Sequence, residues 1–200
     1  MDGTLIRGSS ASLEIARELG KISEFRASED ELAAGALDPP GYAVRAYELW
    51  AELEAKHVAA AFESAPWLRG IREVWADIRE RGEYCAVISL SPSFFVRRLL
   101  DWGAHEARSS VFPDLPFAGA PLDPAGILLP EEKVAVADEL CARFGLSRQD
   151  CIAYGDSMGD APLFAAVPTS VAVNAGPRVN ALADHAYRGH DLREAYALVR

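Results

Sequence analysis

The 200-residue sequence predicts an α/β fold with a doubly wound parallel sheet, and three observations support this. Over residues 67–200, short apolar runs typical of buried strands alternate with segments of helical periodicity. Residues 9–66 show helical periodicity throughout, which predicts a helical insertion. Half of the residues are hydrophobic, which is enough to bury a sizeable core.

Three helices are expected in the insertion. Apolar residues share one face over residues 13–19, and Gly20 ends that helix. A second run covers residues 29–34 and ends at Gly35. After Pro39 and Pro40 a single long helix is expected, because apolar residues recur there at helical spacing. These residues are Tyr47, Trp50, Leu53, Val58 and Phe62.

The remaining sequence alternates between the two element types. Strands are expected at residues 85–89, 110–112, 151–154 and 171–173. Helices are expected over residues 68–82, from Ser91 and Pro92 onward, from Pro130, after the third strand, and from Pro177. A loop rich in proline and glycine is expected over residues 113–129. Asp191 and Glu194 resemble a capping box that begins the last helix.

Composition excludes several classes of partner. The formal net charge of −10 argues against nucleic acid or an anionic membrane. No apolar run reaches the ~18 residues that span a bilayer, and no signal segment begins the chain. The cysteines Cys85, Cys141 and Cys151 lack C-x-x-C spacing, so we expect buried, reduced thiols in a cytoplasmic protein. The sequence does not determine the oligomeric state.

Polar residues gather where the predicted strands end. In a doubly wound sheet, ligands bind beyond the carboxyl ends of the strands. The candidates at these ends, with a lysine one turn into the following helix, are Asp2, Thr4, Ser89, Asp156, Asp160 and Lys133. Carboxylates at one edge suit Mg²⁺, and a serine, a lysine and a helix N-terminus suit phosphate. With an aspartate nucleophile, this set describes hydrolysis of a phosphomonoester through an aspartyl-phosphate.

Four short motifs give the chain a family resemblance. They are Asp2-Gly-Thr-Leu5, Ser89, Lys133 and Gly155-Asp-Ser-Met-Gly-Asp160. In this order they resemble the motifs of the haloacid dehalogenase (HAD) superfamily of phosphatases. The helical insertion, Ser89-Leu-Ser-Pro92 and the stretch 171–177 resemble the phosphoserine phosphatase branch. The resemblance implies a Rossmann-like core formed by residues 1–8 and 67–200, a helical cap formed by residues 9–66, Mg²⁺ as cofactor and a small phosphorylated substrate.

The resemblance also implies a role for each matching residue. Asp2 corresponds to the general acid and base, whose backbone carbonyl binds Mg²⁺, and Thr4 to the residue that supports the first loop. Ser89 corresponds to the phosphate-binding hydroxyl, with Leu90 and Ser91 beside it. In the later motifs, Lys133 corresponds to the lysine that balances phosphate charge, Asp156 to the Mg²⁺ ligand, and Asp160 to the second acidic residue of the metal site.

The sequence departs from the family pattern in three places. The nucleophilic aspartate falls one residue before Met1, and the central strand that carries it is missing, so we expect that Met1 is an internal methionine of a longer protein. The alternative is a truncated relative that has lost catalysis. Gly159 stands where the family usually has asparagine. Residues 8–10 contain no acid to hold a substrate ammonium, which argues against phosphoserine, although Arg45 could hold a substrate carboxylate.

The sequence leaves two other functions open. A binding protein that holds Mg²⁺ or phosphate without turnover is the main alternative. A serine esterase is the second, because residues 155–159 also fit G-x-S-x-G around Ser157. Acids and histidines follow in the order that such enzymes use, at Asp184, His185, His190 and Asp191. Only 43 residues follow Ser157, too few for the strands that normally carry these groups.

Overall fold

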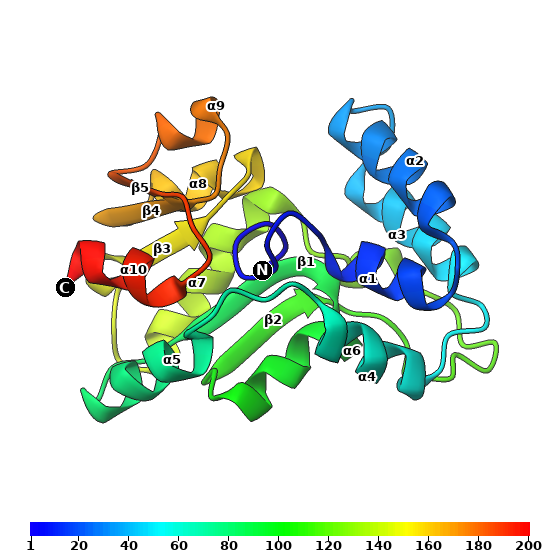
Figure 1. Ribbon diagram of the computed structural model, residues 1–200, viewed down its shortest axis with the longest axis horizontal. Helices are drawn as coiled ribbons and strands as arrows, with labels where there is room; N and C mark the ends of the chain where they lie inside the picture. Colours follow the sequence, from blue (N-terminus) through cyan, green and yellow to red (C-terminus); the bar gives the residue numbers. More distant parts are fainter.

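The computed structural model describes residues 1–200, apart from the side chain of Ala33. Its first part is helical, and Figure 1 shows α2 and α3 side by side at one end of the molecule, with α4 lying below them next to α6. The helices of this part are α1 (Ala11–Glu18), α2 (Ile22–Ala33), α3 (Pro39–Leu49) and α4 (Ala55–Ser64).

The single long helix expected after Pro39 is wrong. The chain leaves the helical conformation between Trp50 and Glu54, and α4 begins with Glu54 as its N-cap. The Glu54 and His57 side chains form a capping box there, which supplies hydrogen-bond partners for the free end of α4. The second helix also begins seven residues earlier than expected, at Ile22.

The strands form two parallel sheets. In the first, β1 (Ala86–Pro92) pairs with β2 (Glu106–Ser110). In the second, β4 (Thr169–Val173) lies between β3 (Ile152–Gly155) and β5 (His185–Tyr187). Among the strands that the structure describes, β1 and β3 each pair on one side only. The predicted parallel, doubly wound arrangement is therefore confirmed, with the strands divided into two groups.

Three strand expectations differ in detail. The strand predicted at residues 110–112 lies at β2, four residues earlier, and β1 continues to Pro92 so that the next helix begins at Ser93. The sequence did not predict β5. The helices of this part are α5 (Ile71–Glu80), α6 (Ser93–Val96), α7 (Lys133–Arg143), α8 (Ala161–Phe164), α9 (Pro177–Asn180) and α10 (Leu192–Tyr196).

The first six residues lie between the two sheets. Figure 1 shows the N-terminal loop between β1 and β3, near the centre of the molecule. Ile6 is fully buried and forms isolated bridges with Asp2 and Trp67. The loop thereby joins the core: its backbone accepts a hydrogen bond from Leu68, which leads into α5. This placement brings residues 2–4 to the carboxyl ends of β1 and β3.

One large hydrophobic core joins the helices of residues 11–64 to the first sheet and α5. A smaller cluster lies under β3, β4 and α8. The three cysteines are free thiols, with Cys141 buried and the other two half-buried. Within the described residues, the longest helix has 12 residues, and none is long and apolar enough to cross a membrane.

Candidate active site

Asp2 lies between the end of β1 and the start of α1. One oxygen of its carboxylate accepts a hydrogen bond from the backbone N–H of Ala11, at 3.0 Å, in the first turn of α1. The other oxygen accepts a hydrogen bond from the hydroxyl of Ser91, which lies near the end of β1. A helix N-terminus and a hydroxyl donor both stabilise a carboxylate. The Asp2 side chain is thus held in a fixed orientation at the strand end.

Asp156 follows β3 and contacts the same N-terminal loop. The hydroxyl of Thr4, only 4% exposed, donates to Asp156 Oδ1 at 2.7 Å. Gly3 has φ +68° and lies so close that an added Cβ would be 1.9 Å from Asp156 Oδ2. The loop therefore requires glycine at position 3, both for its backbone conformation and for the space that the carboxylate occupies.

Lys133 and Asp160 form a buried ion pair beside Asp156. The two charged atoms, Lys133 Nζ and Asp160 Oδ1, are 2.7 Å apart, and both side chains are about nine-tenths buried. Asp160 Oδ2 accepts hydrogen bonds from the backbone N–H groups of Asp156 and Ser157 and from the Ser157 hydroxyl. Asp160 thus fixes both the lysine and the loop that carries Asp156.

The two carboxyls of this loop have opposite pKa shifts. Burial raises the pKa of Asp156 to about 6, although the Thr4 hydrogen bond opposes the shift. Burial would also raise the pKa of Asp160, but the Lys133 ammonium and the hydrogen bonds hold that pKa below its ordinary value. Asp156 is therefore the carboxyl whose negative charge is left with least compensation.

The remaining predicted residues lie in three different places. Leu90 and Ser91 line a pocket that also contains Asp2. Ser89 is buried, and its Oγ accepts a hydrogen bond from the Ser91 backbone at 3.2 Å, so it supports the turn at the end of β1. Arg45 does not line this pocket; its guanidinium pairs with Glu31 at 2.6 Å on the surface of the helical part.

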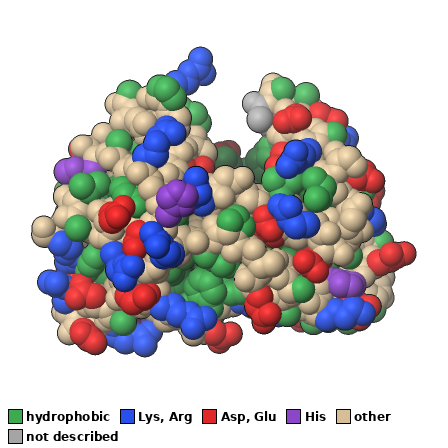
Figure 2. All heavy atoms as spheres, viewed as in Figure 1, with side chains coloured by type: hydrophobic (Ala, Val, Ile, Leu, Met, Phe, Trp, Pro, Cys, Tyr) green, Lys and Arg blue, Asp and Glu red, His purple; other side chains and the backbone are tan. Residues whose placement is uncertain are grey.

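The pocket at Asp2 has a volume of about 260 Å³ and is mainly apolar. Figure 2 shows a hollow between the α2–α3 pair and the part of the molecule that carries α8 and α9, with hydrophobic side chains at its bottom. Sequence reasoning missed the residues that the helices contribute, among them Glu29, Tyr42 and Trp50. They follow the ordinary pattern of an amphipathic helix, so no sequence signal separates them from core residues.

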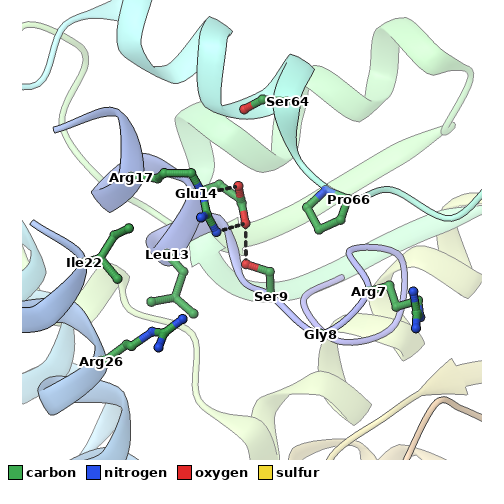
Figure 3. Close-up of a pocket in the computed structure, with 10 residues that line it drawn as sticks. All are labelled: Arg7, Gly8, Ser9, Leu13, Glu14, Arg17, Ile22, Arg26, Ser64 and Pro66. Carbon is green, nitrogen blue, oxygen red and sulfur yellow. Dashed lines mark hydrogen bonds and ion pairs between the residues drawn. The ribbon is translucent and has the colours of Figure 1, made fainter. Parts of the chain in front are cut away.

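A second cavity, of about 320 Å³, lies at the other side of α1. Figure 3 shows Glu14 inside it, with Ser9 and Arg17 pointing toward the carboxylate. Glu14 is 2% exposed; it accepts from the Ser9 hydroxyl and pairs with Arg17 at 3.3 Å. The predicted catalytic residues do not line this cavity, and its carboxylate already has partners.

The donor set suits Mg²⁺. Among the described residues, no group of three or more histidines, cysteines or acids comes together as a metal site. Mg²⁺ needs fewer protein ligands than this, because it is usually held by one or two carboxylates together with water and substrate phosphate. The buried Asp156 carboxylate, held against Gly3, is such a ligand, and the neighbouring Asp2 can add its backbone carbonyl oxygen, since both of its carboxylate oxygens already have partners. Asp160 is less available, since both of its oxygens have partners.

The groups of a serine esterase do not meet here. Ser157 donates its hydroxyl to Asp160 at 3.3 Å. Asp184 accepts hydrogen bonds from the backbone and the hydroxyl of Ser170. His190 contacts Arg7 through Nδ1 at 2.8 Å. Ser157, Asp184 and His190 therefore contact other residues and not each other, as a catalytic triad would require.

Comparison with known proteins agrees with this geometry. Residues 1–165 match the family of haloacid dehalogenase-like hydrolases, and the chain belongs to that family. Comparison with curated protein sequences gives no match.

Two solved structures show how far the similarity of the fold extends. A substrate-bound phosphoserine phosphatase has 23% identity and a TM-score of 0.82, covering 100% of this chain and 95% of its own. A HAD family hydrolase from Salmonella enterica subsp. enterica serovar Typhi has 24% identity and a TM-score of 0.84, covering 98% of this chain and 68% of its own.

Proposed function

We propose that this protein hydrolyses a small phosphomonoester with Mg²⁺, through an aspartyl-phosphate. One observation carries the proposal: the N-terminal loop lies between the ends of β1 and β3 and contacts both, through Ser91 to Asp2 and through Thr4 to Asp156. A general acid, a hydroxyl, a buried lysine and a carboxylate of raised pKa thereby share one edge of the fold.

The residues of the chain take distinct parts in this reaction. Asp2 gives a proton to the leaving-group oxygen and later takes one from water, and the Ala11 N–H and the Ser91 hydroxyl keep its carboxylate oriented. The Ser91 side chain also lines the pocket, beside Asp2. Lys133, held by Asp160, offsets negative charge that builds up on the phosphoryl group.

Asp156 and Asp2 are the residues that would hold Mg²⁺. When bound, the ion supplies neutralisation of phosphate charge and orientation of the phosphate oxygens. Thr4 and Gly3 serve this role indirectly, since they fix where the Asp156 carboxylate lies. The helices of residues 9–66 form the proposed cap, which contributes the apolar wall of the pocket and limits access of water to the reacting groups.

The test combines turnover with binding, because the nucleophile that the resemblance implies falls one residue before Met1. Protein produced from its own gene is assayed with small phosphomonoesters, with Mg²⁺ or with EDTA, and phosphate binding is measured by calorimetry. We expect Mg²⁺-dependent turnover that Asp2→Asn lowers by about 10²-fold or more. An absence of both turnover and Mg²⁺-dependent phosphate binding would reject the proposal.

A binding protein without turnover is the second candidate. It is favoured by the same contacts, since Asp156, Lys133 and Ser91 would hold Mg²⁺ and phosphate whether or not a nucleophile is present. Saturable binding of phosphate with no release from any ester would support it. Free thiols at all three cysteines suit the reducing cytoplasm, where we propose that the protein acts.

A further inference from the structure

The pocket at Asp2 contains a second carboxylate, which the proposed reaction does not use. Glu29 lies on α2 and lines the pocket together with Asp2. It is half-buried, and the Ser10 hydroxyl donates to its Oε1 at 2.5 Å. Among the described residues, the other carboxylate oxygen of Glu29 has no hydrogen-bond partner. Burial is the main cause that raises the pKa of Glu29.

The other walls of the pocket carry no positive charge. Among the described residues that line it, none is a lysine or an arginine. Ala46 and Trp50 form part of the wall, at 2% and 1% exposure. Arg45, next to Ala46 on α3, is paired with Glu31 outside the pocket. Away from the Mg²⁺ and Lys133 that offset the phosphate charge, a substrate carboxylate would therefore be buried here without a partner, which is costly.

Charge and polarity thus select a definite kind of ligand. A phosphate beside Asp2 would leave the body of the substrate against apolar side chains, and an ammonium at its far end would meet Glu29, which lines the same pocket. A charged pair in a partly buried site is favourable when both groups are hydrogen-bonded. An ammonium supplies the missing charge and donors, whereas a methyl group would leave the Glu29 carboxylate uncompensated.

We propose that Glu29 selects phosphomonoesters of amino alcohols, with an ammonium group and a short apolar body but no carboxylate. This inference rests on the proposed function, because it assumes that phosphate binds at Asp2. It assigns the helical part of the chain a role in specificity, through a carboxylate that lies 27 residues after Asp2 in the sequence. Glu29 acts in binding and touches no atom of the phosphoryl group.

The first measurement needs no variant. Protein produced from its own gene is given O-phosphoethanolamine, propyl phosphate and O-phospho-L-serine at equal concentrations with Mg²⁺. Propyl phosphate has nearly the same shape as the first ester, with a methyl in place of the ammonium. We expect kcat/KM to be about tenfold or more higher for O-phosphoethanolamine than for either of the others. Without turnover, the same ratio is measured as Kd.

Glu29→Gln then tests the residue itself. It should remove the preference for O-phosphoethanolamine over propyl phosphate and leave propyl phosphate unchanged or better bound. The matched control is Glu31→Gln, two residues further along α2, whose carboxylate pairs with Arg45 outside the pocket and should not alter the preference. Because Gln keeps the oxygen that accepts from Ser10, the variant retains the local structure.

Each result separates this inference from the proposed function. Reaction or binding of propyl phosphate with no preference for the amine would overturn the inference and leave the proposed function intact. A preference for O-phospho-L-serine, or an equal loss for both esters in Glu29→Gln, would also overturn it. Failure of all three esters to react or bind would reject both proposals.

Discussion

Gly3 determines where the Asp156 carboxylate lies. The backbone at position 3 has the left-handed conformation, which costs about 1–2 kcal/mol for residues other than glycine. A side chain at this position would also overlap the Asp156 carboxylate. Gly3→Ala should therefore lower the free energy of unfolding by at least about 2 kcal/mol. Urea denaturation measures the loss.

Gly8→Ala is the matched control for this substitution. Gly8 has φ +62° but nothing within 4 Å of the added Cβ, so only the backbone cost of about 1–2 kcal/mol applies. Equal losses for the two variants would show that the Asp156 carboxylate moves freely away from position 3. Such a result would remove the argument that the loop fixes this carboxylate.

Glu29 makes stability depend on pH. Its pKa is raised first by burial and further by Asp2 and Asp30, while Ser10 and Arg26 act in the opposite direction. An acid whose pKa is higher in the folded state contributes stability that is full below its ordinary value of 4.5 and is lost as pH rises through the folded pKa.

We therefore expect Glu29→Gln to become more stable relative to the wild type as pH rises from 4.5 to 7.5. Urea denaturation of both proteins across this range gives the difference in the free energy of unfolding. A difference that does not change with pH, or that changes in the opposite direction, would contradict the pKa shift. Glu31→Gln serves as the control, because Glu31 is exposed and paired with Arg45.

The sequence predicted the residues at strand ends but not those of the pocket wall, for a physical reason. The polar residues at the strand ends, such as Asp2 and Asp156, stand out beside apolar runs and glycines. Their side chains are expected at the carboxyl edge of the sheet, where ligands bind. Lys133 stands out in the same way, at the start of the helix that precedes the third strand. Glu29 lies in a helix that also contains Glu24, Asp30 and Glu31. Which of these acids faces the pocket depends on how α2 packs on the core, and this packing is not visible in local periodicity.

At the scale of elements, periodicity predicted most helices but not the interruption between α3 and α4. Apolar residues continue at helical spacing from Tyr47 to Phe62, so the pattern alone favours one helix. The chain leaves the helix at Trp50, whose ring packs among aromatic rings from three other segments, and a capping box at Glu54 begins the next helix. The prediction placed the second strand four residues too late because β2 is polar and lacks the apolar run of a buried strand. Ion pairs such as Arg108 with Glu139, at 3.0 Å, hold β2 against α7.

Trp50 links the helical part to the rest of the molecule. Its ring lies 5.4 Å from Phe25, 5.8 Å from Phe94 and 5.5 Å from Phe112, measured between centroids. Trp50→Ala should lower the free energy of unfolding by about 3–5 kcal/mol, as large-to-small changes in cores do. It should also widen the pocket that Trp50 lines.

Trp50→Phe should cost much less. The indole N–H of Trp50 is buried and lacks a partner among the described residues, so phenylalanine removes an unsatisfied donor while keeping an aromatic ring. Urea denaturation compares the two variants. Similar losses for Ala and Phe would mean that the indole is required as such and that aromatic packing is not the main contribution.

At the scale of the whole molecule, the site depends on a loop that joins two groups of strands. β1 with β2 and β3 with its partners do not share a ladder, yet the ends of β1 and β3 meet the same N-terminal loop, at Asp2 and at Thr4. Both groups of strands must therefore be in place for Asp2 and Asp156 to be neighbours. Binding a cation between Asp2 and Asp156 should stabilise the whole fold, because the unfolded chain does not hold these two residues together.

Mg²⁺ should accordingly raise the melting temperature. At a hundredfold excess over Kd, binding to the folded state adds about 2.7 kcal/mol, which corresponds to roughly 5–10 °C for a chain of this length. Salt alone also screens the net charge of −10, so NaCl at equal ionic strength is the reference condition. Asp156→Asn should abolish the excess over NaCl, and Asp114→Asn should keep it, because the Asp114 side chain is 90% exposed and pairs with Arg97. Equal shifts with NaCl and Mg²⁺, or an unchanged shift in Asp156→Asn, would show that the ion acts through general screening and not at this pair of residues.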